Sequence, residues 1–155
     1  MLENLIHDSS FGSVMRKNIQ ELIVHLFEKD INFGILCNIE DIEFTPPLPE
    51  DIVSQFHTMT LFFLAGYTFE TARIEGDELI FEAGFGSDNF GSVVNVPLLS
   101  IVQVIIDEQP ILINLAKYKK EEPSVIQDEE VVDPQGVENS MSIFLSNPEN
   151  SKFLK

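Results

Sequence analysis

Few residues of this chain have the types and spacing that catalysis or metal binding requires. None of the three histidines (His7, His25 and His57) has a Cys, Asp or Glu partner at the spacing of a metal site. Cys37 lies in an apolar stretch without a cationic neighbour to lower its pKa, which predicts a small buried side chain and not a nucleophile. The sequence therefore predicts a protein that is not an enzyme and that uses no metal or cofactor.

The glycines around residue 84 indicate a different kind of chemistry. Gly84-Phe85-Gly86 resembles the start of a dinucleotide fingerprint, but we expect a strand after it, and not the helix N-terminus that would bind a phosphate. Glycines in the strand expected at residues 79–85 would leave its backbone open to an incoming chain. This arrangement favours a peptide-binding module, in which main-chain hydrogen bonds give affinity and side-chain pockets give specificity.

Residues 59–97 are the stretch that would hold this strand in place. Two apolar, aromatic-rich runs flank residues 75–78, whose Glu-Gly-Asp-Glu sequence is typical of a tight hairpin turn. A second cluster of Gly, Asn, Asp and Ser follows at residues 84–92. The pattern predicts three or four consecutive antiparallel strands.

A helix is predicted ahead of these strands. Asp8, Ser9 and Ser10 offer N-cap side chains, and apolar residues then recur every three or four positions as far as Phe27. The helix should end at residues 30–32. Its apolar stripe is wide enough to pack on a sheet and also on a second subunit.

The remaining elements complete a mainly β fold. Strands are expected at residues 31–39, with a continuation at 42–44, and again at 98–106, after a half-turn, and at 111–116. The three prolines of residues 46–49 predict a rigid loop, and residues 50–56 suit one helical turn. We expect one helix followed by a strongly bent antiparallel sheet of five or six strands, forming a domain over residues 1–118.

Charge and composition limit the classes of partner. The chain has 155 residues, enough for one domain, and a net charge of −17 from 26 acidic and 9 basic residues. This charge disfavours binding to nucleic acid and to anionic membranes. No apolar run approaches the ~20 residues that span a bilayer. With one cysteine and no signal-peptide pattern, the chain is expected to be cytoplasmic.

Residues 119–155 differ in composition from the rest of the chain. They are rich in acidic residues, which predicts a disordered linker of 37 residues that spans on the order of 30–36 Å. Two apolar segments follow the acidic run, at residues 141–145 and at the basic-apolar end formed by Phe153, Leu154 and Lys155. Either segment could be a docking peptide carried by the disordered linker.

Three stretches together resemble one known family. Residues 11–19 (FGSVMRKNI), 75–86 (EGDELIFEAGFG) and 93–101 (VVNVPLLSI) look like the stringent starvation protein B (SspB) family, particularly its alphaproteobacterial branch. The match in order and spacing covers residues 10–115, and the acidic tail is in the expected place. Residues 64–69 depart from the family pattern, which has glutamines and a tryptophan there, and the loop at 86–91 looks about two residues longer than usual.

The resemblance implies an Sm-like bent sheet and a homodimer formed through the helix and a neighbouring strand. It also implies an adaptor that binds the C-terminal ssrA-type tag of stalled translation products and delivers them to the ClpXP protease. The tag would lie between the strands matching residues 64–69 and 81–85. The residues carried over are Leu64, Tyr67, Thr68 and Phe69 on one side, Ala83, Gly84 and Phe85 on the other, and Phe153, Leu154 and Lys155 for docking on the N-terminal domain of ClpX.

One alternative comes from a different class of protein. A long helix with five or six strands could form a hotdog domain, which binds an acyl thioester and can act as a thioesterase. The order of elements argues against this fold, because a hotdog sheet wraps around a central helix, whereas the best helix here precedes the main strands.

Overall fold

The computed structural model of the chain describes residues 1–119. The chain divides into two units, Met1–Tyr118 and Lys119–Lys155, and the fold described here is that of the first. The predicted acidic linker, the segment at 141–145 and the docking residues Phe153, Leu154 and Lys155 lie outside the described residues. None of the helices within residues 1–119 is long and apolar enough to cross a membrane.

The first unit is mainly β, as predicted, with helices at its start. The helices are α1 (Leu2–Ile6), α2 (Ser9–Glu28), α3 (Glu50–Val53) and α4 (Tyr67–Thr71), with 3-10 turns at Ile39–Asp41 and Leu98–Ser100. The strands are β1 (Phe33–Asn38), β2 (Glu43–Thr45), β3 (Met59–Leu64), β4 (Arg73–Glu75), β5 (Glu78–Phe85), β6 (Phe90–Pro97), β7 (Ile101–Ile106) and β8 (Gln109–Ile113).

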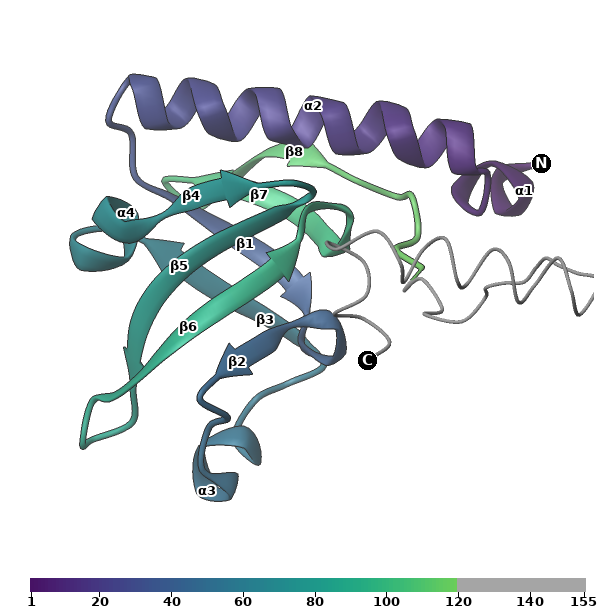
Figure 1. Ribbon diagram of the computed structural model, residues 1–155. Helices are drawn as coiled ribbons and strands as arrows, with labels where there is room; N and C mark the ends of the chain where they lie inside the picture. The colour runs from purple at the N-terminus through teal and green to yellow at the C-terminus, as the bar shows by residue number, and fades with distance from the viewer. Residues whose placement is uncertain (120–155) are drawn as a thin grey trace, which may run out of the picture. The chain divides into compact units, whose positions relative to one another are not determined.

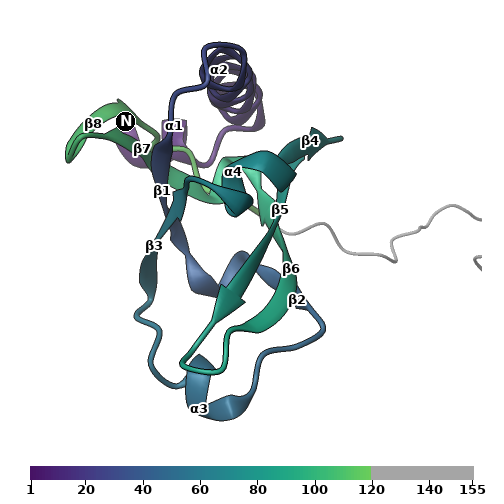
Figure 2. The same ribbon diagram turned by 90° about the vertical axis from the view of Figure 1, so that its left-hand side faces the viewer.

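Helix α2 forms where the apolar period predicts it. The Asp8 carboxylate caps it, accepting hydrogen bonds from the Ser10 hydroxyl and from the Phe11 N–H (3.0 Å). These bonds hold the pKa of Asp8 below its usual value. Figures 1 and 2 place α2 along one end of the sheets and not at their centre, unlike the helix of a hotdog domain.

The strands form two antiparallel sheets, and not the single bent sheet expected from the sequence. Their orders are β3-β1-β7-β8 and β2-β6-β5-β4, each with four strands. The expected continuation at residues 42–44 is a separate strand, because the 3-10 turn at Ile39–Asp41 redirects the chain and β2 then pairs with β6. Figure 2 shows the two sheets on opposite sides of the domain.

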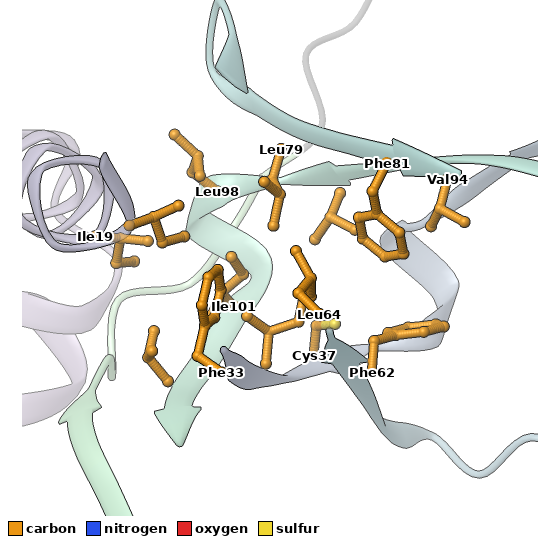
Figure 3. Packing of buried hydrophobic residues seen from close by; sticks show 14 of the residues in the cluster. Ile19, Phe33, Cys37, Phe62, Leu64, Leu79, Phe81, Val94, Leu98 and Ile101 are labelled. Carbon is orange, nitrogen blue, oxygen red and sulfur yellow. The ribbon is translucent and has the colours of Figure 1, made fainter. Parts of the chain in front are cut away.

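The core lies between the sheets and beneath α2. Phe33, Ile35 and Cys37 alternate inward along β1 and meet Leu79 and Phe81 of β5 in one buried cluster. Figure 3 shows these inward side chains, with Ile19 entering from α2. Cys37 is 0% exposed, as predicted, and burial of the thiol, helped by the negative charge of Asp41, raises its pKa to about 12.

Two aromatic clusters extend this core. Phe27, Phe33 and Phe69 join α2, β1 and α4, with ring centroids 5.7–6.4 Å apart. The second cluster contains Phe44, Phe56, Phe62 and Phe85 from β2, the segment after α3, β3 and β5, with centroids 5.6–6.5 Å apart. The second cluster ties the two sheets together at the end of the domain opposite α2, where β2 and α3 lie (Figure 1).

Both hairpins in residues 59–97 are confirmed, but the strand expected at residues 64–69 is wrong. Strand β3 ends at Leu64, Gly66 follows with φ 60°, and α4 begins at Tyr67. The positive φ of Gly66 departs from the extended conformation of a strand, and the chain leaves the sheet there. The last strand was predicted at residues 111–116, but β8 begins at Gln109 and ends at Ile113.

The inward and outward faces of β3 can be tested with two neighbouring phenylalanines. Phe62 is 7% exposed within the second aromatic cluster, whereas Phe63 is 60% exposed on the opposite face. We expect Phe62→Ala to lower the free energy of unfolding by about 3–5 kcal/mol, and Phe63→Ala to lower it by about 1 kcal/mol or less. Urea denaturation followed by circular dichroism measures both, and equal losses would contradict this register.

Candidate functional site

A pocket of about 550 Å³ opens on the outer face of the second sheet, beside the start of α4. Along β5, Leu79, Phe81 and Ala83 contribute to the core, so Glu82, which lies between Phe81 and Ala83, and Gly84, which follows Ala83, point outward. The residues that line the pocket are Thr45, Pro46, Ala65, Tyr67, Thr68, Glu82, Ala83, Gly84, Asn89, Gly91, Ser92 and Val93.

The floor of the pocket is bare backbone. Gly84 of β5 lies directly opposite Gly91 of β6, and both residues are exposed. Next to this glycine pair, Glu82 lies opposite Val93, and Val93 lies opposite Thr45 of β2. Because Gly91 has no side chain and nothing lies above it, a ligand can approach the main chain of β6 there.

The side chain of Asn89 covers part of this floor. Asn89 sits in the hairpin loop with φ 55°, a conformation that asparagine tolerates better than most residues. A Cβ atom added to Gly84 would lie 1.9 Å from Asn89 Oδ1, so the carboxamide already occupies that space. A Cβ atom added to Gly91 would meet nothing within 4 Å, so the space above Gly91 is open.

The rim beside α4 is held by hydrogen bonds. The Tyr67 hydroxyl donates to Glu82 Oε1 (2.5 Å), and this bond, together with the negative charge of Glu82, raises the pKa of Tyr67. Thr68 Oγ1 accepts from the Ala65 N–H (3.0 Å) and donates to the Ala65 carbonyl (2.7 Å). On the other side, Ser92 Oγ donates to the Pro46 carbonyl (3.0 Å) and fixes Pro46 against β6.

One edge of β5 is not covered by a strand beside the pocket. Strand β4 pairs with β5 only from Glu78 to Ile80, whereas β6 pairs with it as far as Phe85. The Glu82 N–H points toward the edge without a strand, where it donates to Thr71 Oγ1 (2.9 Å). The N–H of Gly84, two residues further along the strand, points the same way. An extended segment could therefore add to β5 at this edge.

The structure brings together four of the seven residues expected to bind a peptide. Tyr67, Thr68, Ala83 and Gly84 line the pocket. The other three, Leu64, Phe69 and Phe85, belong to the core or to its aromatic clusters. Leu64 is fully buried, whereas Phe69 and Phe85, like Ala83, are partly buried and pack against the core.

Several lining residues were not expected from the sequence. Thr45, Pro46, Asn89, Gly91 and Val93 come from β2 and from the β5–β6 hairpin. Pairing the two strands around a four-residue loop would have placed Gly91 opposite Gly84, so the sequence did contain this signal. The position of β2 depends on the turn after β1, and the sequence contained no signal that predicted it.

The pocket is suited to binding through backbone and side-chain contacts. Glu82 is the only one of its lining residues with a charged side chain. Within residues 1–119, no group of three or more His, Cys, Asp and Glu residues is placed to hold a metal ion.

A scan against protein-family models, a search of curated proteins and a search of solved structures each found no match to this chain.

Proposed function

We propose that this protein is a peptide-binding adaptor that takes an extended segment into the pocket on its second sheet. The observation that carries this proposal is the exposed Gly84–Gly91 pair beside a strand edge that no other strand covers. Main-chain hydrogen bonds to β5 would supply affinity, and the pocket would receive one or more side chains. This binding mode requires no bond-making by the protein, so we propose that it is not an enzyme.

The nature of the peptide and of the partner comes from the resemblance to the SspB family. On that basis the ligand is the C-terminal ssrA-type tag of stalled translation products, and the partner is the ClpX ATPase of the ClpXP protease. The arrangement of sheets would then be Sm-like, and the protein would act in the cytoplasm, where such products arise.

Delivery would need a second contact. We propose that residues 119–155 carry the protease-docking segment, either 141–145 or the end formed by Phe153, Leu154 and Lys155. A linked pair of weak contacts raises the effective concentration of the tag at the protease to about the millimolar range. Neither contact then has to be tight for degradation to be faster.

We also propose that the protein is a homodimer. Helix α2 and strand β8 carry apolar side chains that the single chain leaves exposed, among them Val14, Ile111 and Ile113. Exposed apolar residues gathered on two elements are typical of a protein–protein interface. These are also the kinds of element through which the resembling family forms its dimer.

Gly91 is the position from which the pocket can be filled, because a Cβ atom added there would meet nothing within 4 Å. We expect Gly91→Gln to weaken binding of a labelled ssrA-type tag peptide by at least about tenfold, because the added side chain occupies the floor of the pocket. Fluorescence anisotropy measures the affinity. Glu43→Gln is the matched control, since Glu43 lies on the same face of β2, two residues from Thr45 and outside the pocket. Unchanged affinity in Gly91→Gln would refute this site.

Deleting residues 141–155 separates binding from delivery. We expect the shortened protein to keep its tag affinity within about twofold but to lose the acceleration of ClpXP degradation, because the tether is broken. The rate is followed with a fluorescent tagged substrate at low concentration. Deleting only 151–155 distinguishes the two candidate docking segments. Loss of tag binding after either deletion would count against this division of roles.

The dimer can be tested at an exposed position of β8. Ile113 is 55% exposed, so Ile113→Ser should change the stability of the single chain by only about 0.5 kcal/mol but weaken the dimer. Light scattering after size-exclusion chromatography gives the mass. Val53→Ser is the control, because Val53 is 47% exposed on α3, at the other end of the domain. A monomeric native protein, or equal effects of both variants, would contradict the proposed interface.

A further inference from the structure

Glu82 is the one charged residue in the pocket. The other lining residues contribute hydroxyl groups, one carboxamide, apolar side chains and bare backbone. Glu82 also lies next to the floor, two residues from Gly84 and on the same outward face of β5. A ligand group that rests on the glycine pair is therefore within reach of a carboxylate.

Hydrogen bonds hold both the carboxylate and the main chain of Glu82. The Tyr67 hydroxyl donates to its Oε1 atom at 2.5 Å, and the main chain of Glu82 is fixed by its N–H bond to Thr71 Oγ1 at 2.9 Å. A carboxylate offers more than one lone pair, so Glu82 can still accept hydrogen bonds from a ligand. It has no hydrogen to donate, and the single hydrogen of the Tyr67 hydroxyl is already used.

The rest of the chain strengthens the effect of this one charge. The net charge of the whole chain is −17, which disfavours association with an anionic ligand in general. Asn89, whose carboxamide lies above Gly84, can offer a hydrogen bond but no positive charge. No lining residue could therefore neutralise a ligand carboxylate at this position.

We propose that the pocket selects its ligand by charge, through Glu82: the residue placed over the Gly84–Gly91 pair carries a hydrogen-bond-donating N–H group, cationic or amide, and a carboxylate there is rejected. This inference rests on the proposed peptide-binding function and defines one feature of the peptide. Tyr67 is a positioning residue, since its hydroxyl holds the Glu82 carboxylate.

The test scans charge along the peptide. Labelled copies of an ssrA-type tag carry Lys, Asn or Asp at each position in turn, and anisotropy gives their affinities for the full chain. We expect one position at which the Asp peptide binds on the order of tenfold more weakly than the Lys peptide, because like charges then meet. An Asn peptide that matches Lys identifies an amide donor, whereas an Asn peptide that is weaker than Lys identifies a cation.

Two variants assign the discrimination to Glu82. Glu82→Gln should reduce the Lys-to-Asp ratio at that position to within about threefold, mainly by improving binding of the Asp peptide. Glu78→Gln removes the same charge from the same face of β5, next to Asn95 and outside the pocket, and should leave the ratio unchanged. A purely structural role of Glu82 would instead weaken all peptides equally.

Three results would overturn this inference. Equal affinity for Lys and Asp peptides at every position would overturn charge selection and leave the proposed function standing. Equal effects of Glu82→Gln and Glu78→Gln would show a general field and not a local contact. No binding by any peptide would overturn the proposed function and this inference with it.

Discussion

The two-residue period of β5 is the constraint on which both the core and the pocket depend. The same strand sends Leu79, Phe81 and Ala83 inward and Glu82 and Gly84 outward. A slip of one residue against β6 would bury the carboxylate and expose the aromatic ring. The ring of Phe81, 1% exposed and 5.9 Å from that of Phe62, therefore fixes the register that presents the pocket.

The pocket also depends on contacts between distant parts of the chain. The rings of Phe44 in β2 and Phe85 in β5 pack edge to face, with centroids 5.6 Å apart. This contact holds β2 in place, and Thr45 and Pro46, at its end, form one wall of the pocket. Across the pocket, the Tyr67–Glu82 hydrogen bond joins α4 to β5. A peptide bound there would meet a surface that is already ordered, which lowers the entropic cost of binding.

Local patterns in the sequence were enough to predict α2 and both hairpins, because each depends on residues close together in the chain, and the apolar stretch around Cys37 was enough to predict its burial. Two features were not predicted: the nonlocal pairing of β2 with β6, which divides the strands into two sheets, and the local positive φ of Gly66 (60°), which ends β3 before Tyr67. The sequence indicated Tyr67, Thr68, Ala83 and Gly84 at the site, but not the opposite wall. Leu64, Phe69 and Phe85, which the family resemblance also assigned to the groove, pack in or against the core, and periodicity alone does not reveal that packing.

The most direct test of the central claim is a nuclear magnetic resonance titration of the ¹⁵N-labelled protein with an unlabelled ssrA-type tag peptide. If the peptide adds to β5, the largest amide shifts should come from Gly84, Gly91 and Tyr67, and the Gly84 N–H should become protected from hydrogen exchange. Shifts confined to α2 and β8, with Gly84 unaffected, would contradict the account and place the peptide elsewhere on the domain.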